Sequence, residues 1–431
     1  MVYLLYDLTL YASALFLVPY YLYRGLRYGK ARHGLRERLG IYAQDFRQLL
    51  HGRKVIWIHA VSVGETRAAI PLLKAMRERY PDALLLLSNV TETGREIAIG
   101  VTEIDHYIFF PFDLRWIVRK ALNLIRPDII IIVETEIWPN FVMEARRLKI
   151  PVVLVNGRIS DRSFPRYRMA GKVLLPILDS IADFCMQSEQ DSRRIRHLGA
   201  HAGRVRVTGN LKFDMQPPQI KHVDLETLKN ELKLPENGRI WVAGSTHDGE
   251  ETQLVNVYLE LRKICPELFL VLVPRHPERC RQVQEELGKL EIAATLRSML
   301  PQLNRTLQAG EVMIVDTLGE MLTLYALADL VFVGGSLVNI GGHNILEAAL
   351  LKKPVLYGSY MQNFKEIGRL VRAAHAGLQV KDSDDLYRQM RILLENPCEA
   401  RRIGENGYHL LEENRGATQK TLEVIDQRIL P

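Results

Sequence analysis

The chain has 431 residues, of which 47% are hydrophobic and 25% are charged, and its net charge is +7. This length predicts two domains of roughly 200 residues each. The excess of Lys and Arg favours anionic partners, such as nucleotides, phosphorylated lipids or a membrane surface. Nucleic acid is disfavoured, because no basic run is interleaved with aromatic residues. The four scattered cysteines form no Cys-x-x-Cys pair, which argues against a disulfide framework or a zinc site and favours a reducing, cytoplasmic compartment.

The first expected element is an apolar N-terminal helix. Residues 2–23 are almost wholly apolar and aromatic, with Asp7 as their one charged side chain. As a helix they would extend about 33 Å, enough to cross a bilayer core. Arg24 and Arg27 open a basic stretch directly behind them, and such residues stay in the cytoplasm. We therefore predict an inner-membrane anchor over residues 1–24, with the body on the cytoplasmic side. A helix that lies in the interface or docks on the protein itself is left open.

From residue 54 onward, apolar runs alternate with helical patterns. Such uninterrupted runs are typical of parallel strands that are buried on both faces. A long helix is expected to begin near Pro165. Strands are expected at residues 54–58, 83–89, 128–133, 152–155 and 205–208 in a first series, and at residues 240–243, 269–273, 312–315, 330–333 and 355–357 in a second.

A proline-bearing stretch without periodicity, residues 215–224, separates the two series and is predicted to be a linker. We predict two doubly wound, Rossmann-like α/β domains, residues 25–214 and 225–415, which face each other across a cleft. For a last helix over residues 416–431, packing back on the first domain is left open. Ligands of such sheets bind beyond the carboxyl ends of the strands, and the polar motifs of this chain lie at those ends.

The first such motif, HAVSVGE, ends in Glu65 at the start of an expected helix. Glu65 could act as a general base, or it could only stabilise the helix start, and the residues alone slightly favour the second interpretation. The helix dipole is expected to lower its pKa. In the motif ETEIWPN, Glu134 and Glu136 would point to opposite faces if the strand continued, so that they would not act as a pair.

Two further motifs of the first half carry cations. Arg158 and Arg162 follow the expected strand at residues 152–155 and could meet an acceptor phosphate, although solvated surface arginines are the commoner case. In GNLKFD, Lys212 lies near the predicted linker and could neutralise charge in a transition state, with a plain surface lysine as the alternative.

In the second half, the most informative segment is FVGGSLVNIGGHNILEAA. Paired glycines let the backbone approach a ligand closely, and the helix expected at residues 343–351 would offer N–H groups to an anion. Glu347 inside this helix could accept hydrogen bonds from a ribose. The segment at residues 243–251 has the small residues of another anion-binding helix start. Arg275 and His276 follow a strand and are suited to a phosphate.

Together these segments resemble the 3-deoxy-D-manno-octulosonic acid (Kdo) transferases of lipopolysaccharide synthesis. The matching motifs, in chain order, are HAVSVGE, ETEIWPN, GNLKFD, STHDGEE, VPRHPER, DTLGEM and GGHNILEAA. The resemblance implies the GT-B fold and the transfer of Kdo, with inversion, from CMP-Kdo to the lipid A precursor lipid IVA. It also implies that no metal and no other cofactor takes part in the chemistry.

The resemblance further implies roles for individual residues. Glu65 corresponds to the catalytic base, and Glu134 and Lys212 correspond to residues that support the transition state. The predicted CMP contacts are Arg275, His276, Leu318, Gly319, Glu320, Asn344, Ile345, Leu346 and Glu347.

Three other functions fit the sequence less well. A nicotinamide-dependent dehydrogenase is disfavoured, because no Gly-x-Gly-x-x-Gly follows the first strand. A membrane-tethered scaffold would not need this series of polar turns. Another GT-B enzyme that uses a UDP-sugar is the runner-up.

Overall fold

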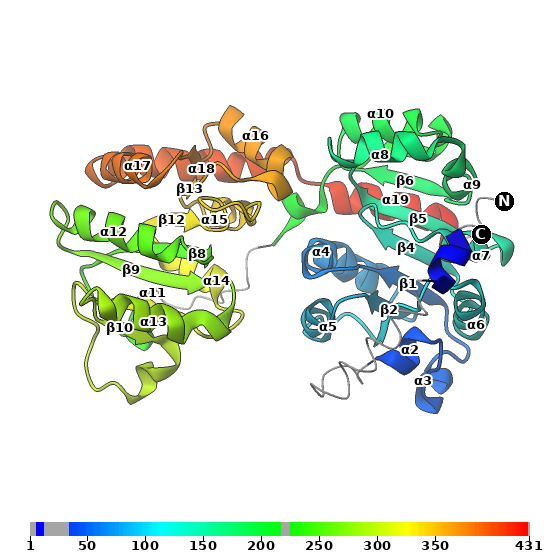
Figure 1. Cartoon of the computed structure of the whole chain (residues 1–431), viewed down its shortest axis with the longest axis horizontal. Coiled ribbons are helices and arrows are strands. Elements are labelled where there is room, and N and C mark those ends of the chain that lie inside the picture. Colours follow the sequence, from blue (N-terminus) through cyan, green and yellow to red (C-terminus); the bar gives the residue numbers. More distant parts are fainter. Residues whose placement is uncertain (1–5, 13–33, 217–224, 430–431) are drawn as a thin grey trace. The chain divides into compact units, whose positions relative to one another are not determined.

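A computed structural model describes residues 6–12, 34–216 and 225–429 of the chain. The chain forms two compact units: unit 1 contains residues 1–215 together with residues 414–431, and unit 2 contains residues 216–413. Each unit holds one seven-stranded sheet with parallel neighbours and helices on both faces (Figure 1). The predicted doubly wound α/β architecture is therefore confirmed for each unit.

The sheet of unit 1 has the strand order β3-β2-β1-β4-β5-β6-β7. Its strands are β1 (Val55–His59), β2 (Leu84–Asn89), β3 (His106–Phe109), β4 (Ile129–Val133), β5 (Val152–Gly157), β6 (Asp183–Met186) and β7 (Val205–Val207). The helices of this unit are a helix over residues 6–12, then α2 (Leu35–Arg38), α3 (Gln44–Leu49), α4 (Val63–Arg79), α5 (Glu92–Ile99), α6 (Arg115–Ile125), α7 (Pro139–Arg147), α8 (Ser163–Ala170), η1 (Gly171–Val173), α9 (Leu175–Leu178), α10 (Glu189–His197), η2 (Ala202–Arg204), η3 (Leu211–Asp214) and α19 (Ala417–Ile429).

The strands of unit 1 divide their side chains between two cores. In β1, Val55 and Trp57 join one core, whereas Ile56 and Ile58 join the other. The first core is covered by residues of α6, α7 and α10, and the second by residues of α4, α5 and α19. Successive side chains of a strand point to opposite faces, so an uninterrupted apolar run is needed wherever both faces are covered.

The sheet of unit 2 has the strand order β10-β11-β9-β8-β12-β13-β14. Its strands are β8 (Arg239–Thr246), β9 (Leu268–Pro274), β10 (Ala294–Leu296), β11 (Val312–Ile314), β12 (Leu330–Val333), β13 (Val355–Tyr357) and β14 (Leu378–Gln379). Its helices are α11 (Leu225–Glu231), α12 (Glu251–Arg262), η4 (Pro277–Arg279), α13 (Cys280–Lys289), η5 (Arg297–Gln302), α14 (Met321–Leu327), α15 (Leu346–Leu350), η6 (Gln362–Phe364), α16 (Lys365–Ala373), α17 (Ser383–Glu395) and α18 (Pro397–Glu413). One face of the sheet packs on α12, α13 and α17.

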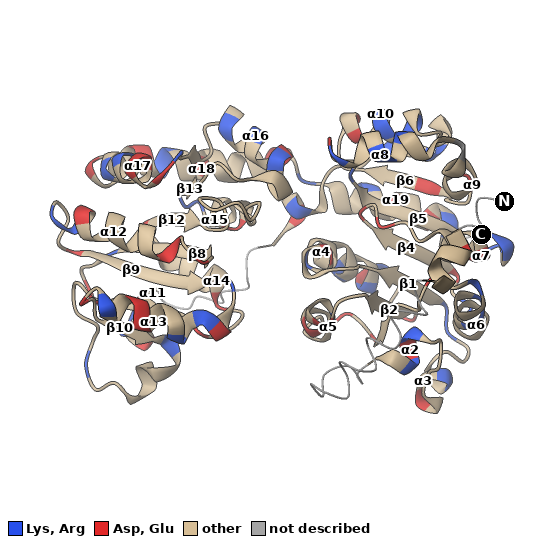
Figure 2. Ribbon diagram, in the orientation of Figure 1, with Lys and Arg blue, Asp and Glu red and all other residues tan. Residues whose placement is uncertain are grey.

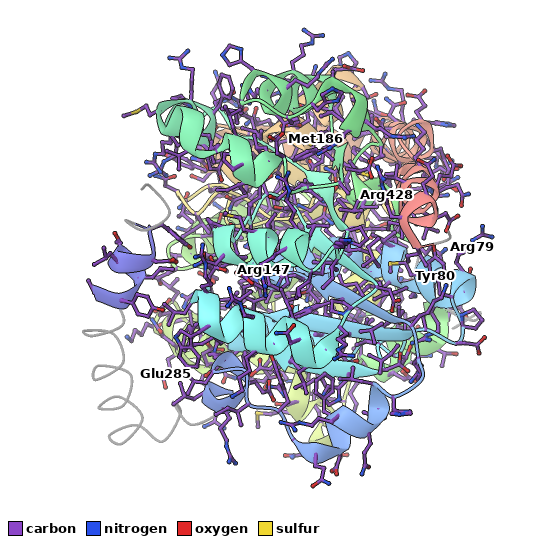
Figure 3. The ribbon with its side chains drawn as sticks, turned by 90° about the vertical axis from the view of Figure 1, so that its right-hand side faces the viewer. Arg79, Tyr80, Arg147, Met186, Glu285 and Arg428 are labelled. Carbon is purple, nitrogen blue, oxygen red and sulfur yellow. The ribbon has the colours of Figure 1, made fainter. Side chains whose placement is uncertain are left out.

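The C-terminal helix α19 belongs to the core of unit 1, where Leu422 and Ile425 are buried. Arg79 and Tyr80, at the end of α4, both donate hydrogen bonds to Asp426 of α19 (Figure 3). Arg428 of the same helix forms an ion pair with Asp183 of β6 at 2.5 Å. These contacts fix α19 to both α4 and the sheet.

The predicted membrane anchor, residues 1–24, lies outside the described residues except for residues 6–12, and the predicted linker, residues 215–224, is described only at its first two positions. The Tyr6 hydroxyl donates to Asp113 at 2.9 Å, and Asn140 donates to Asp7 at 2.7 Å. In the described parts of the chain, no helix has both the length and the apolar character needed to cross a membrane.

Two local expectations were wrong, and a third, that Glu65 lies at the start of a helix, was confirmed. The long helix expected near Pro165 is α8, which ends at Ala170 because Gly171 takes φ 46° and ψ −123°. The helix expected at residues 343–351 is the five-residue helix α15, which begins only at Leu346. The helix α4 begins at Val63 because Ser62 caps it, which brings Glu65 into its first turn.

Candidate active site

The polar motifs gather where the strand order of each sheet reverses. In unit 1, the neighbouring strands β1 and β4 lie at this point, and in unit 2 the strands β8 and β12 do. Beyond the carboxyl ends of such strand pairs, open α/β sheets bind their ligands. The segments with Glu65 and Glu134 follow β1 and β4, and the segments with His247 and Gly334 follow β8 and β12.

The position of Glu65 is fixed by a capping box at the start of α4. Ser62 is the N-cap, and its hydroxyl accepts from the Glu65 N–H at 3.5 Å and donates to Glu65 Oε1 at 3.0 Å. Glu65 Oε2 accepts from the Val61 N–H at 2.6 Å. From the sequence, stabilisation of the helix start and base catalysis were alternative roles for Glu65. In the structure, the carboxylate that makes the hydrogen bonds at the helix start is also the group that would act as the base. The two roles are therefore compatible in one side chain.

The electrostatic environment of Glu65 is unusual for a residue in the first turn of a helix. Its side chain is buried, and burial together with the negative charge of Glu134 raises its pKa to about 7. The hydrogen bonds from Val61 and Ser62 act in the opposite direction without cancelling these effects, and Glu136 raises the pKa further. The lowered pKa expected from the helix dipole was therefore wrong, because desolvation and like charge outweigh it.

The strand β4 ends at Val133, and Glu134 takes a left-handed backbone conformation with φ 61°. The chain therefore turns here, and the expected alternation of Glu134 and Glu136 across a continuing strand does not apply. Both carboxylates instead act on Glu65, and Glu136 also has a raised pKa through burial and Glu134. Glu134 and Glu136, two positions apart in the sequence, thus belong to one cluster of carboxylates with Glu65.

Lys212 supplies the cation of this cluster, with its Nζ 3.6 Å from Glu134 Oε1. Its short helix η3 is held at both ends. The Leu211 N–H donates to Asn156 Oδ1 at 3.0 Å, and Asp214 accepts from the N–H groups of Gly416 and Thr418 at 2.7 and 2.5 Å. Residues that precede α19 and begin it therefore fix the turn that carries Lys212.

A buried network supports the segment between Glu134 and α7. The Trp138 indole donates to His59 Nε2 at 3.1 Å, so that this nitrogen is unprotonated and His59 carries its proton on Nδ1. His59 Nδ1 lies 3.3 Å from the carbonyl oxygen of Ser88, and burial lowers the pKa of His59 to about 3. His59 is therefore a neutral structural link, and the pair it forms with Trp138 joins the ends of β1 and β4.

Of the other predicted cations, Arg158 donates its backbone N–H to Thr135 at 3.0 Å, next to Glu134. Arg162 is the N-cap of α8. The stretch of residues 158–168 contains four arginines and one acid, Asp161, and Figure 2 shows further basic residues on α10. This side of unit 1 is basic.

In unit 2, the glycine turn after β12 is occupied by a side chain of the protein itself. Glu250 is fully buried, and its carboxylate accepts from the N–H groups of Gly335, Ser336 and Leu337 at 2.7, 3.0 and 2.8 Å. It also accepts from the His247 N–H at 3.0 Å. The N–H groups of Gly335, Ser336 and Leu337 therefore bind an internal carboxylate, and Glu250 is by position the N-cap of α12, without a side-chain capping hydrogen bond.

The first glycine of this turn serves the internal carboxylate. A Cβ atom on Gly334 would lie 2.6 Å from the Ser245 carbonyl oxygen and 2.8 Å from Glu250 Oε2. Glycine is therefore required here for the packing of the two loops. The result is a rigid connection between the end of β8 and the end of β12.

Imidazole and guanidinium groups surround this connection. His247 Nε2 lies 2.8 Å from His343 Nε2, and the His247 ring packs edge-on against His276 with centroids 5.8 Å apart. Burial and the neighbouring charges of His276, Arg275 and Arg279 lower the pKa of His247 to about 4. This corner of unit 2 therefore offers positive charge and hydrogen-bond donors to an anion.

The other predicted donor contacts lie at the ends of β11 and β12. Leu318 is 80% exposed, and Gly319 has φ 89°. Glu320 accepts from Arg297 at 3.1 Å and from the Thr317 hydroxyl. Asn344 Oδ1 accepts from the Leu346 N–H at 3.3 Å, next to the buried Ile345. Glu347 lies in the first turn of α15, where its charge helps burial to raise the pKa of Tyr325.

Comparison with known sequences identifies the family of the chain. A family model described as 3-deoxy-D-manno-octulosonic-acid transferase (kdotransferase) matches residues 33–215. A 3-deoxy-D-manno-octulosonic acid transferase of Haemophilus influenzae is 34% identical over 397 residues, which cover 91% of this chain and 91% of that protein. The chain belongs to the Kdo transferase family. Its members are glycosyltransferases, and the enzyme class expected from the motifs is confirmed.

Further relatives of this Kdo transferase extend the comparison. A bifunctional glycosyltransferase/methyltransferase of Fusobacterium nucleatum is 33% identical over 91% of this chain and 60% of its own length. The solved structure of a UDP-GlcNAc 2-epimerase from Neisseria meningitidis, bound to UDP-GlcNAc, superposes with a TM-score of 0.60 at 16% identity and covers 87% of this chain and 100% of that one. This likeness shows the fold alone, two parallel α/β sheets consistent with the GT-B type.

Sequence reasoning missed several residues of the Kdo transferase sites. His247 and His343 stand in the motifs STHDGEE and GGHNILEAA, but no role was assigned to them, because they are 96 positions apart. A histidine in each of two motifs that follow strands was the available signal. For Glu250 and its partners no signal existed, since an acid near a helix start usually serves that helix.

Proposed function

We propose that this Kdo transferase moves Kdo from CMP-Kdo to a hydroxyl of the lipid A precursor lipid IVA, with inversion at the anomeric carbon. The observation that carries the proposal is Glu65, a buried carboxylate with a pKa of about 7 beside the strand pair β1 and β4. A general base is most effective when its pKa lies near the working pH. Glu65 is thereby suited to take the proton of an attacking hydroxyl.

In the proposed step, the acceptor oxygen forms a bond to the anomeric carbon while the bond from this carbon to the donor phosphate breaks. The hydroxyl proton passes to Glu65, and the electron pair of the broken bond leaves with CMP. A single displacement of this kind inverts the anomeric centre. Lys212 and Glu134, which lie 3.6 Å apart, would support the charges that develop around the reacting atoms.

For the donor, we propose that unit 2 binds CMP-Kdo. Arg275, His276 and Arg279 surround His247 with positive charge, which suits a phosphate. Glu347 would bind the ribose, and the exposed Leu318 with Gly319 and Glu320 would contact the base. Positive side chains would balance the charge of the leaving phosphate, so that the proposal includes no metal.

For the acceptor, we propose that unit 1 binds a phosphorylated lipid at the inner membrane, with the body on the cytoplasmic side and residues 1–24 as the anchor. The basic stretch of residues 158–168 supports this, since arginine forms paired hydrogen bonds with phosphate. The apolar sequence of residues 2–23 supports the anchor.

The proposal is tested by incubation of the full-length protein with CMP-Kdo and lipid IVA, followed by mass analysis of the lipid. We expect the lipid to gain the mass of Kdo residues and CMP to appear. In parallel, CMP should raise the melting temperature and UDP should not. Stabilisation by UDP alone, with no lipid product, would favour a UDP-sugar enzyme.

A further inference from the structure

The pair of histidines in unit 2 has a geometry with a chemical consequence. His247 directly follows β8, His343 precedes α15, and their Nε2 atoms are 2.8 Å apart with ring planes inclined by 3°. A hydrogen bond between two imidazole nitrogens needs one proton between them. In the neutral pair one ring donates its Nε2–H and the other ring, protonated on Nδ1, accepts it; one further proton, on the free Nδ1 of the donating ring, would make the pair a cation.

The surroundings of His247 disfavour its protonated form when no anion is bound. His247 is partly buried, and Arg275, His276 and Arg279 lower its pKa further, to about 4. The nearby acids do not compensate, because each is already engaged. Glu250 accepts from four backbone N–H groups, and Glu251 and Asp248 form ion pairs with Arg279 at 3.1 and 2.9 Å.

An anion placed among these cations would reverse the balance. The negative charge of a phosphate favours the protonated imidazole in the same way that the neighbouring cations disfavour it. The leaving phosphate gains one negative charge as the bond to the sugar breaks, and a phosphate monoester has a second pKa near 6. A proton donor at that oxygen would therefore assist departure.

We propose that the His247–His343 pair takes up one proton when the donor phosphate binds, and passes it to the phosphate oxygen that leaves the sugar. This inference rests on the proposed function, because it requires a nucleoside monophosphate as the leaving group. The proton balance closes. The acceptor proton goes to Glu65, the proton of the pair goes to the leaving oxygen, and both sites return to their starting state by exchange with solvent.

The inference is tested by calorimetry of CMP binding to the full-length protein at pH 7.5, in two buffers with different ionisation enthalpies. CMP then arrives mostly as the dianion. We expect a net uptake that approaches one proton per CMP bound for the unmodified protein. Cytidine, which lacks the phosphate, should show no uptake.

Three variants complete the experiment. His247→Gln and His343→Gln should each abolish most of the proton uptake and lower kcat by roughly 100-fold, a loss typical of a missing general acid. His409→Gln, an exposed histidine of α18, should behave like the unmodified protein. If CMP binds without proton uptake, or with undiminished uptake in both pair variants, this inference fails while the proposed function stands. If CMP does not bind at all, both fail.

Discussion

The two strand pairs at which the sheets reverse have the same topology and opposite chemistry. Beyond β1 and β4, Glu65, Glu134 and Glu136 crowd together, and Lys212 forms an ion pair with Glu134. Beyond β8 and β12, three histidines and two arginines gather. Of the acids there, Glu250 is bound by backbone N–H groups, Asp248 and Glu251 by Arg279, and Glu278 lies 3.7 Å from His276. The fold thus provides two equivalent positions, and the residues at the strand ends decide that one suits a base and the other an anion.

The two regions also differ in how they are held. Glu65 is fixed by its own helix start, within four residues of its partners. The histidine corner is held by Glu250, which reaches across 85 to 87 positions to the glycine turn. The first site is therefore defined by local sequence, and the second depends on a long-range contact.

The largest expected effect is on catalysis in unit 1. Glu65→Gln removes the base but retains the shape and one hydrogen-bond acceptor, so kcat should fall by roughly 1000-fold. CMP affinity, measured by calorimetry, should stay within twofold. The exposed Glu92, in the first turn of α5, is the matched control, and Glu92→Gln should retain full activity. Full activity of Glu65→Gln would remove the base assignment.

The next effect concerns stability in unit 2. Glu250→Gln replaces one carboxylate oxygen by a donor, which leaves two of the four backbone N–H groups without an acceptor. A loss of about 2–4 kcal/mol in the free energy of unfolding is expected, measured by urea denaturation. The exposed acid Glu285 of α13 is the control, and Glu285→Gln should change stability by less than about 0.5 kcal/mol. Equal stability of the two variants would contradict the interpretation that the Glu250 carboxylate stabilises the glycine turn after β12.

A smaller effect on stability is expected from substitution of Gly334, whose lack of a side chain leaves room for the Glu250 carboxylate. Gly334→Ala would place a Cβ atom against the backbone of Ser245 and Thr246, at 2.6 and 2.7 Å, and should cost about 1–3 kcal/mol. Gly288→Ala, in α13 with open space around it, should be neutral or slightly stabilising. Thermal melts of both variants check this, and a neutral Gly334→Ala would show that the turn can relax.

The smallest effect is a shift of a pH profile. In the proposed mechanism ionised Glu65 is the active form, so turnover should rise as the pH increases through about 7. Glu134→Gln removes a like charge and lowers the pKa of Glu65. The rise in turnover should therefore shift to lower pH by on the order of one unit. Glu136→Gln should move it less, since its charge has the weaker influence. If turnover rises at the same pH in Glu134→Gln as in the unmodified protein, a group other than Glu65 controls this rise.

The apolar runs alone were enough to predict the two parallel sheets, because strands covered on both faces consist mostly of apolar residues. The expected strands at residues 54–58 and 128–133 fall within one residue of β1 and β4. The strands β3 and β6 were missed, since each has only four residues and begins with a polar one, His106 or Asp183. The edge strands β10 and β14, of three and two residues, are too short to show any pattern.

For the site, the sequence placed the polar motifs at strand ends but could not give their electrostatics. The pKa of Glu65 depends on burial and on Glu134, which is 69 positions away by residue number. The partners of Glu250 and the contact between His247 and His343 likewise arise only when β8 and β12 lie side by side. Local patterns such as the capping box at Ser62 remain readable, because their partners are three residues apart.

The placement of α19 has a consequence for the order in which the two units fold during synthesis. Domains usually fold as their residues emerge during synthesis, with the N-terminal one first. Here the core of unit 1 includes Leu422 and Ile425, and its Lys212 turn is fixed by Gly416 and Thr418. The unit translated first therefore waits for α19 to be made, whereas unit 2 can complete its own sheet earlier. Until α19 is made, the carboxylate cluster of unit 1 lacks the contacts from Gly416 and Thr418 that fix the turn with Lys212.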